Sequence, residues 1–166
     1  TNKIEGYNYT LDDRDTELFE TIFQDLKKNL EGNKMDEEQY AKNLAELFVI
    51  DLYTLNNKVS KYDIGGLEYM YEGTLNSFRS KALDAIYKTV EDDSYKTRTQ
   101  ELPIVKSIES STPKKVNYQM EGQTQSGYEI NVKWTYEKDL GYDTSGTIIM
   151  IKEENKLSIV SFNNTK

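Results

Sequence analysis

The first half of the chain carries apolar residues at the spacing of α-helices. A first helix is predicted after Asp12 and Asp13, because carboxylates are favourable at a helix N-terminus. Gly32 suits the position that follows its last turn. The apolar face of this helix consists of Leu18, Phe19, Ile22, Phe23, Leu26 and Leu30.

A second helix is predicted to begin at Asp36, because Asp36 and Gln39 have the spacing of a capping box. Residues 48–55 are apolar on nearly all sides, so we expect this helix to be the most buried element. The remaining residues on its apolar face are Tyr40, Leu44 and Leu47.

A third helix is predicted to begin near Thr74 or Asn76 and to end at the acidic residues 91–93. Negative charge is unfavourable at a helix C-terminus, so we expect that end to be frayed or paired with a basic group. Residues 67–71, which precede this helix, fit either a short strand or a helical turn, and we favour the strand.

After Pro103 the pattern changes to the alternation of β-strands. The clearest strand covers residues 128–136, in which every second residue is apolar or aromatic. The breaks between successive strands are short enough for hairpins, which predicts an antiparallel meander. The other strands are predicted at residues 104–108, 116–120, 148–151 and 157–162.

These patterns predict one α+β domain over residues 1–166, because 166 residues fit a single domain. The helical part covers about residues 12–93 and the sheet part about residues 102–162. We expect the N-terminal helices to pack on a curved antiparallel sheet.

The composition narrows the chemistry that the chain can perform. The net charge is −8, and 20 of the 29 acidic residues lie in residues 1–98, so nucleic-acid binding is disfavoured. The chain has no Cys and no His, which excludes disulfides, thiolate nucleophiles, imidazole bases and the usual zinc sites. Its acidic clusters lack the spacing of an EF-hand, so we expect neither a metal nor a cofactor.

The order of helices and strands resembles the nuclear-transport-factor-2-like (cystatin-like) fold over about residues 12–162. The segments FVIDLYTLNNK (48–58) and DIGG (63–66) also resemble uncharacterised exported domains of Gram-positive bacteria. The resemblance implies a curved sheet that wraps around helices as a cone. Some domains of this fold are small isomerases or dehydratases with a pocket in the cone, and others are extracytoplasmic assembly domains.

Asp51 is the candidate for acid–base chemistry, because it lies on the apolar face of the second helix. Desolvation raises the pKa of a carboxyl group into the range that a general acid or base needs. The structural alternative is a carboxylate that caps a turn or pairs with Lys58.

Aromatic residues supply candidates for a ligand-binding wall. The alternative is that alternating aromatic residues form the core face of the sheet. The candidates are Tyr53, Tyr69, Tyr71 and Trp134, with Tyr128 and Tyr136 beside them.

From these observations we expect a non-enzymatic, extracytoplasmic interaction or assembly domain of a bacterial membrane-anchored or secreted protein. Its partner would be another protein or a second copy of itself. Contact with a membrane would come only from a segment upstream of Thr1. The alternative is a small-molecule-binding protein or an isomerase- or dehydratase-like enzyme that uses Asp51, and it requires a cavity that reaches this residue.

Overall fold

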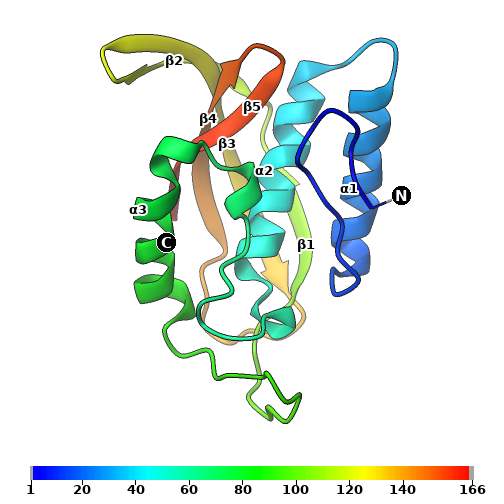
Figure 1. Ribbon diagram of the computed structural model, residues 1–166, viewed down its shortest axis with the longest axis vertical. Coiled ribbons are helices and arrows are strands. Elements are labelled where there is room, and N and C mark those ends of the chain that lie inside the picture. The colour runs from blue at the N-terminus through cyan, green and yellow to red at the C-terminus, as the bar shows by residue number, and fades with distance from the viewer. Residues whose placement is uncertain (1, 165–166) are drawn as a thin grey trace.

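The computed structural model describes residues 2–164. It confirms an α+β architecture in which helices pack on an antiparallel sheet through α2 (Glu37–Tyr53). In Figure 1, α2 lies in front of the sheet, with α1 (Glu17–Glu31) and α3 (Glu72–Ala82) on its two sides.

The first helix begins later than the acidic pair predicted. Thr16 is the N-cap of α1, and its hydroxyl accepts a hydrogen bond from the Phe19 N–H. Asp12 and Asp15 instead close a turn before the helix, in which each accepts a hydrogen bond from the other's backbone N–H. The start of α2 is as expected, because the Asp36 carboxylate accepts from the Gln39 N–H at 3.2 Å.

The strand that we favoured at residues 67–71 is wrong. Leu67–Tyr69 form a 3₁₀ turn, and Met70 makes only an isolated parallel bridge to Ile159. Gly66, in the left-handed conformation with φ +85°, reverses the chain before this turn. The chain then has only Met70 and Tyr71 in extended conformation before α3 begins.

The third helix ends earlier than predicted. It passes from α3 into a π-helical turn (Leu83–Tyr87), so the acidic residues 91–93 lie beyond it. The carboxylate of Asp93 accepts a hydrogen bond from the Arg98 N–H and lies 4.0 Å from the Arg98 guanidinium group, which is the pairing with a basic group that we expected as one alternative. The predicted conflict between negative charge and the helix C-terminus therefore does not arise.

The sheet is antiparallel, with the strand order β1-β3-β4-β5, and β2 also pairs with β3. β1 and β2 lie one after the other along the same side of the long strand β3, with Pro113 in the break between them. The strands are β1 (Val105–Ser110), β2 (Lys114–Met120), β3 (Gln123–Tyr136), β4 (Ser145–Glu153) and β5 (Lys156–Asn164).

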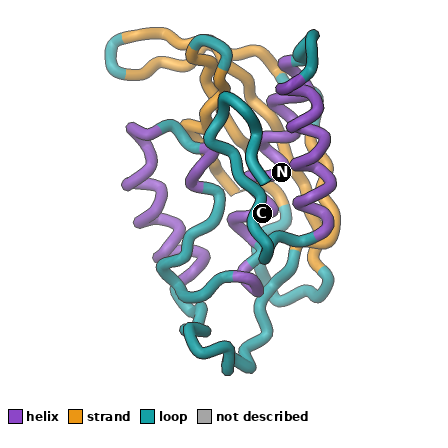
Figure 2. Tube along the Cα trace, turned by 45° about the vertical axis from the view of Figure 1, so that its right-hand side comes forward, coloured by secondary structure: helices purple, strands orange, loops and turns teal. Residues whose placement is uncertain are grey.

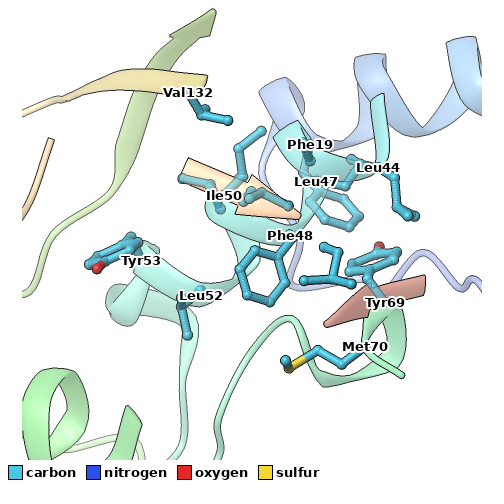
Figure 3. Close-up of a cluster of buried hydrophobic side chains, with 14 of the residues drawn as sticks. Phe19, Leu44, Leu47, Phe48, Ile50, Leu52, Tyr53, Tyr69, Met70 and Val132 are labelled. Atoms are coloured by element: carbon cyan, nitrogen blue, oxygen red, sulfur yellow. The ribbon is translucent and has the colours of Figure 1, made fainter. Parts of the chain in front are cut away.

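The space between α2 and the sheet is filled by side chains. The Tyr53 ring packs on Trp134 and Phe162, with ring centroids 5.0 and 6.2 Å apart. Phe48 fills the neighbouring space against Phe162 and Phe78. Figure 3 shows the side chains of α2 in this cluster together with Tyr69 and Met70. The side of the sheet that faces α2 is therefore a packed core.

The β2–β3 hairpin extends beyond the rest of the sheet. β3 pairs with β4 only from Gly127 onward, so residues 123–126 have β2 as their sole strand neighbour in the described chain. Figures 1 and 2 show this hairpin projecting from the body of the domain. A two-stranded ribbon buries little surface by itself, so this part of the sheet is the least supported.

Candidate functional site

Asp51 lies at the centre of a network of ionic and hydrogen bonds near the end of α2. One carboxylate oxygen accepts from the Lys58 ammonium group at 3.3 Å, and the other accepts from the Gly66 N–H at 2.7 Å. The Asp51 side chain is 24% exposed, whereas that of Lys58 is 1% exposed. The geometry is that of the structural alternative, in which Asp51 pairs with Lys58 and caps a turn.

Lys58 is a buried cation whose three ammonium protons all have acceptors. Besides Asp51, it donates to the Thr54 carbonyl at 2.9 Å and to the Asn57 side-chain oxygen at 2.8 Å. Burial lowers the pKa of Lys58, and the Asp51 carboxylate opposes this shift. Both partners are therefore needed, because removing either one leaves the charge of the other without its counter-ion.

The loop with Gly65 and Gly66 packs directly on the end of α2. The Gly65 N–H donates to the Tyr87 hydroxyl, which itself donates to the Leu52 carbonyl at 2.7 Å. A Cβ atom at Gly65 would lie 2.0 Å from the Asp51 carbonyl oxygen. The glycine therefore permits a close approach between two backbone segments.

A polar hollow of about 180 Å³ lies beside Asp51. Its acidic groups include Asp15 and Glu68, and Glu68 accepts hydrogen bonds from the backbone and hydroxyl of Thr10. Burial raises the pKa of Asp15 to about 6, against the effect of the hydrogen bond from Asp12, and the Asp51 carboxylate adds to the rise. Burial also raises the pKa of Glu68. The hollow thus holds carboxyl groups with high pKa values next to a fixed ion pair.

Replacing Asp15 with asparagine is expected to raise the free energy of unfolding by about 1 kcal/mol at pH 8, after allowance for solvent screening. Native Asp15, with its raised pKa, holds its proton up to about pH 6, whereas an unfolded aspartate has its ordinary pKa of 3.8. Its carboxyl group therefore destabilises the fold as the pH rises through this window. Urea unfolding at several pH values measures the effect.

The gain from Asp15→Asn should disappear below about pH 4, where the carboxyl group is neutral in both the folded and the unfolded chain. Asparagine keeps an oxygen that can accept from the Asp12 N–H, so the turn is retained. The exposed Asp13 offers a matched control, because Asp13→Asn removes the same charge from the same turn. A gain of equal size in both variants would contradict the role given to burial.

Three of the six aromatic candidates lie together, and the other three lie in separate parts of the fold. Tyr53, Trp134 and Tyr136 lie together at one end of the sheet, where the Trp134 indole N–H donates to the Tyr136 hydroxyl at 2.8 Å. The Tyr53 hydroxyl donates to the Asp143 carboxylate at 2.8 Å, and the Tyr136 hydroxyl donates to the Asp143 carbonyl. The polar groups of the three side chains are therefore joined through Asp143 in one hydrogen-bonded network beside the core.

The other aromatic candidates lie elsewhere. Tyr69 packs on Tyr9, and its buried hydroxyl group has no hydrogen-bond partner within the described chain. Burial, with the nearby Glu68 carboxylate, raises the pKa of Tyr69. Tyr71 lies next to β5, where its N–H donates to the Ile159 carbonyl. Tyr128 donates its hydroxyl proton to Glu37 at the start of α2. The six candidates do not line one common pocket.

The outer side of β2 is an unpaired strand edge. Both turn residues of the β2–β3 hairpin, Glu121 and Gly122, have positive φ angles, as in a two-residue type I′ turn. Such a turn makes Met120 and Gln123 a hydrogen-bonded pair, and the bonding alternates along the strands. The backbone groups of Lys115, Asn117 and Gln119 therefore point away from β3, where residues 2–164 supply no strand partner.

The other sides of the sheet are less open to strand addition. β5 is flanked by Met70, which forms an isolated bridge to Ile159, and by Tyr71, whose N–H donates to the Ile159 carbonyl. β1 has an irregular register at Val105–Ser107 and ends shortly before Pro113. β2, in contrast, pairs with β3 over seven residues without a register shift and contains no proline. An uninterrupted edge of this kind is a template for another strand.

Residues 2–164 contain neither a cluster of acidic metal ligands nor a membrane-spanning helix. No group of three or more acidic side chains is placed to hold a metal ion. None of the helices in this range has both the length and the apolar character of a membrane span.

Comparison of the chain with protein-family models, with curated proteins and with solved structures finds no match. The α+β architecture is therefore established by the structure itself, and the site must be interpreted from its own geometry.

Sequence patterns did not indicate two residues that hold the fold together. Arg98 lies between the predicted helical and sheet parts, yet its guanidinium group donates to the carbonyls of Lys58, Glu91 and Asn56. Asp143 lies in the loop before β4 and binds the hydroxyl of Tyr53 and the amide of Asn164. Their partners are distant in sequence, so no local spacing could indicate them.

Proposed function

We propose that this chain is a non-enzymatic interaction domain that binds a protein partner by strand addition at the outer edge of β2. The observation that carries the proposal is the row of outward backbone groups at Lys115, Asn117 and Gln119 on a projecting hairpin. Main-chain hydrogen bonds at such an edge provide affinity, and the alternating side chains provide specificity.

The side chains of β2 suit a contact surface. Val116, Tyr118 and Met120 share one face of the strand and are half-buried, whereas the residues between them are exposed and polar. None of the three belongs to the main core or packs against it. Their remaining apolar surface is therefore available to a partner.

The interior of the domain supports this proposal over the enzymatic alternative. The space between α2 and the sheet is occupied by aromatic side chains, and Asp51 is held by Lys58 and Gly66. A general acid or base must reach a substrate, whereas both carboxylate oxygens here already accept hydrogen bonds. The observation that favours the alternative is the hollow of about 180 Å³ beside Asp51.

We further propose that the domain belongs to an extracytoplasmic, membrane-anchored or secreted bacterial protein with a nuclear-transport-factor-2-like fold. The absence of Cys suits an exported chain, because such a protein needs no reducing compartment. The order of three helices followed by an antiparallel sheet is compatible with that fold.

Photo-cross-linking in the cells that produce the protein tests the interaction function. A benzophenone amino acid replaces Tyr118 on β2 or, as controls, the exposed tyrosines Tyr62 and Tyr95, which are 69% and 86% exposed. We expect covalent protein adducts to be several-fold more abundant at position 118 than at either control. Equal yields at the three positions would contradict docking at this edge.

A further inference from the structure

We propose that the partner at the β2 edge is a second copy of this chain, bound antiparallel about a two-fold axis at Tyr118. This inference rests on the proposed function and names the occupant of the same edge. A two-fold contact requires a surface that is complementary to itself, and the sequence of β2 has this property.

The charges of the hairpin select an antiparallel arrangement. The first two residues of β2 are Lys114 and Lys115, and Glu121 stands at its other end in the turn. A parallel pair of β2 strands would place the lysines of the two copies side by side. An antiparallel pair separates them and brings each basic end near the acidic end of the other strand, which is favourable.

The unpaired backbone groups and the charges together select one register. Placing Tyr118 opposite the partner's Tyr118 sets Asn117 opposite the partner's Gln119, so the outward N–H and C=O groups of both strands meet. The same register sets Lys115 opposite the partner's Glu121. A shift that centres the pair on Asn117 would leave Lys115 opposite the partner's Gln119 and lose the charge pairing.

The side chains on the apolar face also match in this register. Val116 lies opposite the partner's Met120, and the two Tyr118 rings form a cross-strand aromatic pair. Apolar and aromatic cross-strand pairs of this type stabilise antiparallel strands. Pairing of the two edges would therefore join the sheets of both copies and cover the half-exposed residues of β2.

Disulfide cross-linking of single-cysteine variants tests the register, since the chain has no cysteine of its own. In the proposed register, the two Tyr118 positions form a non-hydrogen-bonded pair with Cα atoms about 4.5 Å apart. This distance lies within the roughly 4.4–6.8 Å that a disulfide spans. We expect purified Tyr118→Cys to form a covalent dimer under mild oxidation.

Two control variants make the cross-linking result specific. Gln125 lies opposite Tyr118 on β3, so Gln125→Cys carries a thiol on the same hairpin away from the edge and should remain monomeric. Asn117→Cys should cross-link less than Tyr118→Cys, because residue 117 faces its own copy only in the shifted register. Equal cross-linking of Tyr118→Cys and Gln125→Cys would overturn the proposal, and stronger cross-linking of Asn117→Cys would overturn the register.

Sedimentation of the unmodified chain provides a second measurement without a thiol. We expect reversible dimers, and we expect Asn117→Pro to weaken self-association at least about tenfold, because proline removes an outward N–H without disturbing a bond to β3. A purified chain that stays monomeric at all concentrations would overturn self-pairing. If position 118 then still cross-links to a different protein in cells, the interaction function stands and only the identity of the partner changes.

Discussion

Replacing Gly65 with alanine is expected to lower the free energy of unfolding by about 3 kcal/mol or more, which is at the upper end for single substitutions. The added Cβ would lie 2.0 Å from the Asp51 carbonyl oxygen and 2.6 Å from its carbonyl carbon. Both atoms belong to the backbone at the end of α2, so no side-chain rotation relieves the contact. Urea unfolding followed by circular dichroism measures the loss.

Gly122→Ala is the matched control for Gly65→Ala. Gly122 has φ +75°, but an added Cβ there would meet no atom within 4 Å. The control therefore reports only the cost of the left-handed backbone, about 1–2 kcal/mol. A loss at Gly65 no larger than the loss at Gly122 would show that the loop does not press against α2 as described.

Replacing Asp51 with asparagine is expected to destabilise the fold by about 3 kcal/mol, because it leaves the Lys58 charge buried without its counter-ion. Asparagine retains an oxygen for the Gly66 N–H, so the variant removes mainly the charge. Lys58→Met should cost less, since the remaining Asp51 carboxylate is partly exposed. Urea unfolding at pH 7 of the two single variants and the double variant measures the coupling.

The double variant Asp51→Asn/Lys58→Met should recover much of the stability lost in Asp51→Asn, because it removes both charges and fills the site with an apolar chain of similar length. Losses that simply add in the double variant would show that the two side chains act independently. That result would also reopen the catalytic interpretation of Asp51, since its carboxylate would then be free of a structural task.

The sequence pattern predicted the helices and strands whose apolar faces lie against the core. It failed where contacts between distant segments determine the local structure. The Asp36 cap and the alternation of residues 128–136 are local signals, and the structure confirms both elements. β3, however, begins five residues earlier, at Gln123. Residues 123–126 belong to the projecting hairpin and are mostly exposed, so they need no apolar alternation.

At residues 67–71 the local pattern predicted a strand that the structure does not form. Their aromatic and aliphatic side chains are typical of a strand, but the reversal at Gly66 places Tyr69 in the core by means of a 3₁₀ turn. The pairing of Asp51 with Lys58 was an explicit alternative, because a buried carboxylate needs a partner. The approach of Gly65 to the backbone of Asp51 could not be inferred, since it depends on how the loop returns to α2.

The sequence predicted the strand that carries the candidate docking edge, but it did not predict that the outer side of this strand is unpaired. The alternation of Val116, Tyr118 and Met120 predicted a strand, which the structure confirms as part of β2. Whether the outer side of that strand is paired depends on strand order, and strand order is a property of the whole sheet. β1 and β2 share one side of β3, and this arrangement leaves the outer edge of β2 unpaired in the described chain.

The most direct test of the central claim, that this domain acts through its β2 edge and not through a pocket, is the photo-cross-linking comparison in cells. The account predicts adducts concentrated at position 118 and few at the exposed control positions 62 and 95. Equal yields at the three positions, with a small molecule retained at stoichiometric level in native mass spectrometry, would contradict it and direct attention to the hollow beside Asp51.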